Sequence, residues 1–337
     1  MSKTDGKLWV GIFISLFCIA LLFLKIDFGK LRAAFCEMDY RYLFPAVLFT
    51  FVSYYFRAVR WRFLLLPIGK TRMNNLFAAT IIGYMANNLL PARIGEFIRA
   101  YVLGEKEGID KSAVFATLVL DRLFDGFTVL VILLIAFFSV SLPAGMEKVQ
   151  KALVTGGYVT LAIYVAVIVF LVILKRRTSQ TIHVVGCLLR PFPAKLGERI
   201  IPVLGSFIEG LRLSSRIHEL ASLFLTSIVI WAFALWPVDL TLRSFGILLP
   251  ISASMFILVF LVFAVMVPAS PGYVGTYHAA CVYGLMAFNI RLEKALSIAI
   301  VIHAINFFPV VLAGFYYLWK GNMSLRRIRL ASSHQES

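Results

Sequence analysis

Long runs of apolar residues dominate the chain and determine its predicted architecture. A helix rises about 1.5 Å per residue, so roughly 20 apolar residues cross the roughly 30 Å hydrocarbon core of a membrane. Six runs are suitable full spans, at 8–24, 42–66, 113–140, 152–174, 220–239 and 295–319. They lack the alternation of polar and apolar residues that is typical of outer-membrane strands. The pattern therefore predicts an all-α polytopic membrane protein.

Two further apolar regions, 76–104 and 251–288, are interrupted by helix-breaking residues. Most of the pieces on each side of a break are too short to cross a membrane alone. Each region is therefore predicted to form a re-entrant or broken pair of helices. The breaks are expected at Pro91, Gly95, Pro271, Gly272 and Gly275.

Positive charge is distributed unevenly between the loops. The chain holds 33 Lys and Arg but only 17 Asp and Glu, for a formal net charge of +16. With the N-terminus in the cytoplasm, the inside loops contain more than twice as many Lys and Arg as the outside loops. This bias follows the positive-inside rule and predicts that both termini are cytoplasmic. Because the basic residues lie between apolar runs, they favour contact with anionic lipids rather than with nucleic acid.

The order of predicted helices repeats within one integral membrane domain, 1–337. Units at about 42–140 and about 220–319 each contain a full span, a broken pair and a second full span. The single span between them makes the second unit enter from the opposite side, which gives an inverted repeat of the kind found in transporters. The polar segment 175–219 has apolar residues at helical spacing among basic ones, which predicts a cytoplasmic amphipathic helix on the membrane surface.

The stretch NNLLPARIGEFIRAYVLG places charged residues beside the first predicted break. The half-helix after the break would direct free backbone N–H groups into the protein, and Arg93 would add positive charge there. Such a site suits a phosphate group. Glu96 and Arg99 are three residues apart and can pair on one helix face. Alternatively, these side chains extend to the membrane interface and fix only the depth of the helix.

A second charged motif, LVLDRLFDGF, lies inside a predicted span and contains Asp121, Arg122 and Asp125. Charged residues at this depth need partners, so the three are predicted either to bind substrate or to form a structural ion-pair network. The two carboxylates can also share a proton and couple transport to a proton gradient. At the cytoplasmic end of the first unit's first span, the motif RAVRWRFLL contains Arg57, Arg60 and Arg62. This cluster predicts either a positive-inside anchor or an entrance that captures phosphate.

The second broken region contributes histidines. His278 follows the second break, and His303 lies in the last predicted span. They are either hydrogen-bonded packing residues or, by the inverted symmetry, part of the same midplane cavity as Arg93. In the second case, activity is expected to change between about pH 5.5 and 7.5. A metal site from these histidines with Asp121 and Asp125 lacks any ligand pair at metal-site spacing, so no metal and no cofactor is predicted.

NNLLPARIGEFIRAYVLG followed by ATLVLDRLFDG, and PASPGYVGTYH followed by AIVIHAINFFPVVLAG, resemble the lysylphosphatidylglycerol synthase transmembrane region and flippase-like family. The resemblance covers roughly 8–320 and implies a multi-pass protein of the bacterial inner membrane that handles charged lipids, or lipid-linked glycans as in archaeal relatives. The synthases carry a soluble aminoacyl-transfer domain, but this chain ends soon after its last predicted span, so lysyl transfer is not expected. Many members have an acidic residue near His278 and an Arg near His303, so the second-half site is expected to differ in substrate or pH dependence.

These features favour a flippase-like transporter of an anionic lipid, either a phospholipid or a polyprenyl-phosphate-linked lipid. Its expected partners are anionic membrane lipids. No nucleophile with an adjacent base is evident, so the chain is not expected to be an enzyme. Two alternatives are an integral membrane enzyme acting on a lipid phosphate or lipid-linked sugar carrier, and a structural partner of a cell-envelope enzyme.

Overall fold

The computed structural model describes residues 27–90, 94–139, 147–189, 194–211, 217–266 and 271–323. These residues are helical with short connections, and no strand occurs among them. Three helical segments are long and apolar enough to cross a membrane: Tyr40–Leu65, Ile217–Ser244 and Leu292–Lys320. The predicted all-helical class is therefore confirmed. The predicted span at 8–24 lies outside the described residues.

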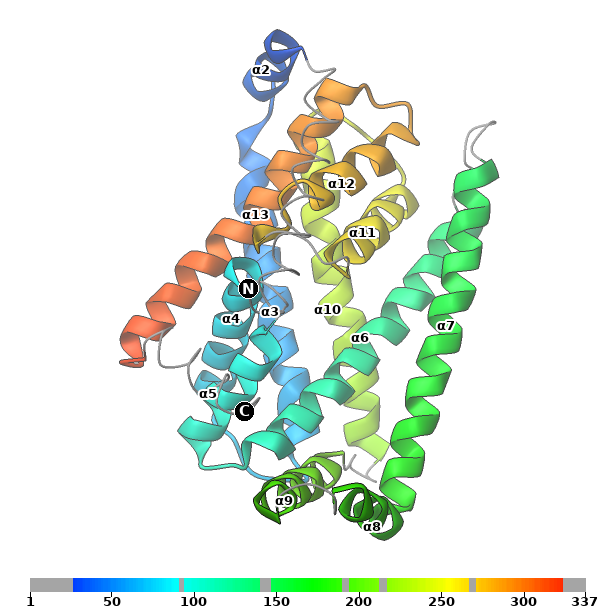
Figure 1. Cartoon of the computed structure of the whole chain (residues 1–337). Helices are drawn as coiled ribbons and strands as arrows, with labels where there is room; N and C mark the ends of the chain where they lie inside the picture. The colour runs from blue at the N-terminus through cyan, green and yellow to red at the C-terminus, as the bar shows by residue number, and fades with distance from the viewer. Residues whose placement is uncertain are drawn as a thin grey trace, which may run out of the picture.

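The helices follow one another in a simple order (Figure 1). They are α2 (Phe28–Cys36), η1 (Tyr40–Tyr42), α3 (Leu43–Leu65), α4 (Met73–Leu89), α5 (Gly95–Glu107), α6 (Lys111–Ser139), α7 (Glu147–Arg176), α8 (Thr178–Leu189), α9 (Ala194–Gly210), α10 (Ile217–Ser244), α11 (Ile251–Met266), η3 (Pro271–Tyr273), α12 (Thr276–Met286) and α13 (Leu292–Lys320). The five predicted spans within the described residues coincide with α3, α6, α7, α10 and α13.

Each interrupted region contains two shorter helices. In the first region, α4 has 17 residues and α5 has 13, and in the second, α11 has 16 and α12 has 11. All four are shorter than the roughly 20 residues that cross a bilayer core. Gly272 and Gly275 have φ angles of 76° and 96°, a left-handed conformation that glycine adopts without strain, and both lie in the second break. Gly95 begins α5, while Pro91 lies outside the described residues.

The first and second halves of the chain pack against each other through matching helices. Helices α3 and α10 lie antiparallel, and the backbone N–H of Asp39 before α3 donates to the carbonyl of Ser244 at the end of α10 at 2.8 Å. Helix α4 packs against α13, and α11 packs against α6, so each first half-helix contacts the last span of the other half. A two-fold related pair of units predicts this reciprocal packing. The inverted repeat itself and the placement of the termini stay predictions.

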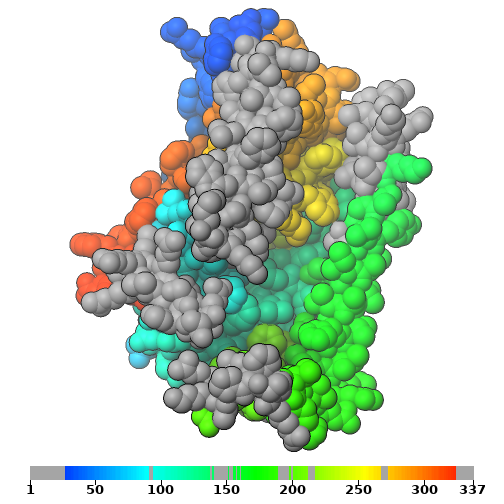
Figure 2. Space-filling view, viewed as in Figure 1, coloured from blue at the N-terminus to red at the C-terminus, as the bar shows by residue number. Residues whose placement is uncertain are grey.

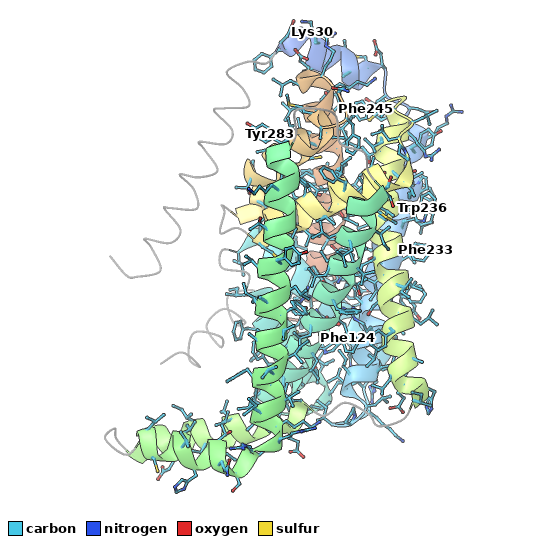
Figure 3. The ribbon with its side chains drawn as sticks, turned by 90° about the vertical axis from the view of Figure 1, so that its right-hand side faces the viewer. Lys30, Phe124, Phe233, Trp236, Phe245 and Tyr283 are labelled. Atoms are coloured by element: carbon cyan, nitrogen blue, oxygen red, sulfur yellow. The ribbon has the colours of Figure 1, made fainter. Side chains whose placement is uncertain are left out.

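Helices α7, α8 and α9 lie at the periphery of the molecule. Helices α8 and α9 lie crosswise at the foot of the long helices (Figures 1 and 3), where the sequence predicted an amphipathic surface helix. Helix α7 stands at the edge of the view in Figure 2, with α6 visible beside it. Many apolar side chains of α7 are exposed, as expected for a helix that faces lipid, including Val159, Leu161, Ile163, Val165, Ile168, Val169, Phe170, Val172 and Ile173.

Candidate functional site

Asp125 on α6 is the centre of a buried cluster of charged side chains. Its Oδ2 accepts hydrogen bonds from Arg57 Nη1 at 2.8 Å and from Arg122 Nη1 at 3.1 Å. Its Oδ1 accepts from Arg60 Nη2 at 2.8 Å and from the indole Nε1 of Trp231 at 3.2 Å. The carboxylate therefore joins α3, α6 and α10 through four donors, three of them cationic.

Asp121, one helical turn before Asp125, extends the cluster toward α5. Its Oδ1 accepts from Arg60 Nε at 2.8 Å, and its Oδ2 lies 3.5 Å from Arg99 Nη1. The guanidinium of Arg99 lies over the Trp61 ring at 4.4 Å from its centroid. Trp61 is held in turn by a 2.9 Å hydrogen bond from its Nε1 to Thr117 Oγ1. Arg99 is thus buried between an aromatic face and a carboxylate, both of which stabilise a cation.

Glu96 and Arg122 form the edge of the cluster beside the first break. Arg122 Nε lies 3.4 Å from Glu96 Oε1, and Arg122 Nη2 donates to the Tyr84 hydroxyl at 3.0 Å. The amide of Asn87 donates to both Glu96 oxygens at 3.2 and 3.3 Å, and its Oδ1 accepts from Gly95 N at 2.8 Å. The first backbone N–H of α5 is therefore bound by the protein itself.

The described part of the cluster carries more positive than negative charge. It contains four guanidinium groups and three carboxylates, from Arg57, Arg60, Arg99, Arg122, Glu96, Asp121 and Asp125. With every group ionised, one positive charge is in excess. Four buried atoms in this part of the chain have no hydrogen-bond partner: Arg99 Nε and Nη1, Asp121 Oδ2 and Arg122 Nε. The excess positive charge favours an anionic ligand.

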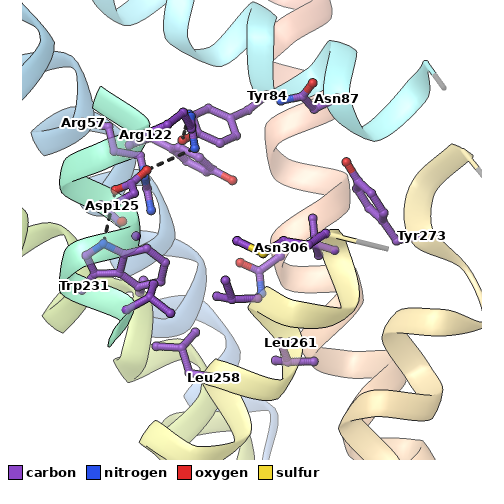
Figure 4. Close-up of a pocket in the computed structure, with 18 of the residues that line it drawn as sticks. Arg57, Tyr84, Asn87, Arg122, Asp125, Trp231, Leu258, Leu261, Tyr273 and Asn306 are labelled. Carbon is purple, nitrogen blue, oxygen red and sulfur yellow. Dashed lines mark hydrogen bonds and ion pairs between the residues drawn. The ribbon is translucent and has the colours of Figure 1, made fainter. Parts of the chain in front are cut away.

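A cavity of about 680 Å³ opens beside this cluster and is lined by residues of α3, α4, α5, α6, α7, α10, α11, η3, α12 and α13. One end is polar, where Arg57, Tyr84, Glu96, Arg122 and Asp125 reach the wall (Figure 4). The opposite wall is formed by apolar side chains of α11, which are Leu258, Leu261, Val262, Val265 and Met266. The cavity is therefore amphipathic along its length.

The second half of the chain contributes His303, Asn306 and Tyr273 to the same cavity. The imidazole of His278 packs edge-on against that of His303, with ring centroids 4.8 Å apart, and its Nδ1 accepts from Gly275 N at 3.3 Å. His303 thus lines the cavity. His278 is not among the lining residues, and its side chain caps the N-terminus of α12. Helix α4 contacts η3, and Gly272 lies beside the carbonyl of Asn88 near the end of α4, so the described ends of the two interrupted regions lie close together.

The structure changes several pairings expected from the sequence. Arg57 and Arg60 do not form a surface group with Arg62, because they point into the cluster while Arg62 is exposed. Residues 57 and 60 share one face of α3, and position 62 lies on another. Glu96 pairs with Arg122 rather than with Arg99, its expected partner.

Arg122 and Asp125 do pair at 3.1 Å, as their spacing of three predicts. Asp121 and Asp125 of the motif LVLDRLFDGF form ion pairs with α3. Such pairs agree with a structural ion-pair network, which was the alternative to substrate binding for this motif. Arg93 and Pro91 lie outside the described residues, so the expected contact of Arg93 with the cavity stays a prediction.

The sequence interpretation missed three polar or aromatic groups of the site. Trp231 lies within an apolar span, where an aromatic residue gives no sign of a function. Tyr84 and Asn87 belong to the helix before the first break and line the cavity. Asn87 is the first residue of NNLLPARIG, and an Asn close before a proline is also typical of an ordinary turn. Their partners lie on other helices, so only the folded chain reveals them.

Comparison with known proteins places this architecture in a family. Residues 8–314 match the family described as the lysylphosphatidylglycerol synthase TM region. The chain is 23% identical over 339 residues to the glycosyltransferase AglD of Haloferax volcanii, covering 94% of this chain and 54% of AglD. It is 25% identical over 277 residues to a UPF0104 membrane protein of Methanothermobacter thermautotrophicus, covering 78% of this chain and 80% of the relative. A UPF0104 membrane protein of Pyrococcus horikoshii is 24% identical over 296 residues, covering 83% and 87%.

The chain therefore spans about half the length of AglD and most of the length of the two UPF0104 proteins. The family match includes the helices that build the charged cluster and the cavity, from α3 to the cavity-lining part of α13. The chain is a multi-pass membrane protein that belongs to the lysylphosphatidylglycerol synthase TM region family.

Proposed function

We propose that the protein is a flippase-like transporter that moves an anionic lipid, a phospholipid or a polyprenyl-phosphate-linked lipid, across the bacterial inner membrane. The observation that carries this proposal is the amphipathic cavity, which has cationic side chains at one end and an apolar wall at the other. A volume of about 680 Å³ is in the range of small-molecule sites. It suits a lipid headgroup together with the first part of its tails.

The cationic end fits a phosphate group. Arg57 and Arg122 both line the cavity, and their planar guanidinium groups can each donate two parallel hydrogen bonds to phosphate oxygens. The positive charge in excess within the cluster attracts such a ligand. A zwitterionic or neutral headgroup brings no net negative charge to this end and is attracted less strongly.

The apolar end has a route toward lipid. Helix α7 contributes Ile163 and Val167 to the cavity wall, and many of its apolar side chains are exposed. The hydroxyl of Tyr164 lies 2.7 Å from the carbonyl oxygens of both Arg122 and Leu123, which attaches α7 to α6 next to the cavity. Lipid tails would lie along α7 and α11 while the headgroup occupies the polar end.

The test is movement of fluorescently labelled phosphatidylglycerol between the leaflets of vesicles that contain the purified protein. We expect faster movement of this anionic lipid than of labelled phosphatidylcholine. Arg122→Gln should abolish the gain, and Arg122→Lys should restore part of it, because an ammonium keeps the charge but loses the planar fork. Arg41→Gln is the matched control, since Arg41 is exposed and outside the cluster. Equal rates with and without folded protein, for phosphatidylglycerol and for a labelled polyprenyl phosphate, would reject the proposal.

A second function, an integral membrane enzyme acting on a lipid-linked sugar, is favoured by the similarity to AglD, which is named a glycosyltransferase. Incubation of the pure protein with a polyprenyl phosphate and nucleotide sugars tests it. A new sugar-bearing lipid seen by mass spectrometry, and absent for Arg122→Gln, would replace transport with catalysis as the function.

A further inference from the structure

Among the described cations of the cluster, Arg122 is the most exposed. Its side chain is 32% exposed, whereas those of Arg57, Arg60 and Arg99 are exposed by 9% or less. It also lines the polar end of the cavity. An anionic headgroup in the cavity therefore meets Arg122 before it meets the other cations.

Arg122 is already occupied in this structure. Its guanidinium contacts Glu96 at 3.4 Å, Asp125 at 3.1 Å and the Tyr84 hydroxyl at 3.0 Å. A guanidinium has five N–H donors in a fixed plane. All three nitrogens already face a partner, since Nε lies near Glu96, Nη1 donates to Asp125 and Nη2 donates to Tyr84. A phosphate that binds through two parallel hydrogen bonds uses two of these nitrogens and therefore competes with at least one of the partners.

Glu96 is the partner most easily displaced. Asp125 is held in place by Arg57 and Arg60 at 2.8 Å and by the indole of Trp231, so its side chain can move away from Arg122 only by breaking those contacts as well. Within the described residues, Glu96 is held by the long contact to Arg122 and by two weak hydrogen bonds from the neutral amide of Asn87. Displacing Glu96 thus breaks fewer and longer contacts than displacing Asp125.

A displaced Glu96 would be an ionised carboxylate facing a cavity without its described cation. Among the described residues, the charged and titratable groups near it are Arg122, Asp121 and Asp125 from α6, Arg99 from α5 and Tyr84 from α4. Those elsewhere on the cavity wall are Tyr54, Arg57, Tyr164, Tyr273, Tyr277 and His303. Arg99 and Asp121 are paired with each other, and the headgroup would occupy Arg122. A carboxylate at membrane depth that loses its cation is more stable as the neutral acid.

From this geometry we propose that Glu96 takes up a proton when the headgroup binds. This inference rests on the transport function proposed above. The headgroup takes the place of Glu96 on Arg122, and one proton from water forms an O–H bond on the freed carboxyl group. A singly charged headgroup then replaces a singly charged carboxylate, so the charge of the cluster is unchanged. The protein would move each anion together with one proton.

The test measures binding of short-chain dihexanoyl phosphatidylglycerol to the purified protein in detergent over a range of pH. We expect the wild-type dissociation constant to rise about tenfold for each unit of increase in pH, over the range in which one proton is taken up per ligand. Glu96→Gln, a permanent mimic of the neutral acid, should bind with a dissociation constant that does not change over that range. Glu105→Gln on the same helix is the control, since Glu105 is exposed and pairs with Lys111, and it should keep the wild-type slope.

The outcomes separate this inference from the function on which it rests. Binding by the wild type with no pH dependence rejects proton coupling and leaves anion binding intact. A wild-type slope in Glu96→Gln assigns the proton to another group and overturns the proposal, and loss of the slope in His303→Gln does the same. Folded Glu96→Gln that binds at no pH would show that the carboxylate itself holds the ligand. Absence of binding by the wild type rejects both the coupling and the anionic substrate.

Discussion

Replacing Asp125 with Asn removes the negative charge at the centre of the cluster but keeps the size of the side chain. Three guanidinium groups and the Trp231 indole lie within 3.2 Å of the Asp125 oxygens. The Asn amide nitrogen is itself a donor, so it opposes one of these donors instead of accepting from it. Removing one partner of a buried ion pair typically costs about 3–5 kcal/mol. We expect a loss of unfolding free energy of that size for Asp125→Asn.

Unfolding of the purified protein in mixed micelles, titrated with a denaturing detergent and followed by circular dichroism, measures this loss. The double variant Arg57→Gln with Asp125→Asn removes one charge of each sign, so it should be more stable than the sum of the two single variants predicts by about 0.5–3 kcal/mol. Asp39→Asn is the control, because its pair with Arg41 is at the surface. An unfolding curve for Asp125→Asn that coincides with that of the wild type would refute the reasoning that these ion pairs hold the bundle together.

Two further predictions concern the packing around the site. Gly95→Ala should lower the unfolding free energy by about 1–3 kcal/mol in the same titration, because the added methyl group collides with the carbonyl of Gly83 and separates α4 from α5. The control Gly156→Ala, where an added methyl meets no atom within 4 Å, should not be destabilised, and equal curves for both would contradict the close packing of these helices. Trp231→Phe keeps the ring but removes the hydrogen bond to Asp125, and we expect a loss of about 1 kcal/mol. Leaflet exchange of labelled phosphatidylglycerol should slow in this variant, and an unchanged rate together with unchanged stability would remove Trp231 from the site.

The sequence predicts the helices well because each apolar run and each glycine or proline acts locally. The bounds of α10 show the limit of this approach. Hydropathy ends the span at Asp239, but the helix continues to Ser244. Asp239 is buried there because Arg243 Nε donates to its Oδ2 at 2.6 Å and Ser254 donates to its Oδ1 at 3.2 Å. A charge that has partners one turn away and on the next helix does not end a helix.

The charged residues of the site were also visible in the sequence, but their partners were not. Spacing predicts pairs within one helix, such as Arg122 with Asp125. Arg60 instead reaches Asp121 from another helix, and Arg99 is turned toward Trp61 because α5 packs closely on α4. Contacts between helices depend on packing that no local pattern encodes. The same reason explains why Trp231 was not predicted.

The central claim is that the cavity beside Arg122 holds an anionic lipid. Native mass spectrometry of the protein, released from lipid nanodiscs that contain equal amounts of phosphatidylglycerol and phosphatidylcholine, tests this claim most directly. We expect the folded wild type to retain phosphatidylglycerol in preference to phosphatidylcholine, and a variant with both Arg57→Gln and Arg122→Gln to lose that preference while the Arg41→Gln control keeps it. Equal retention of the two lipids by the wild type, or the same preference in the double variant, would contradict the account.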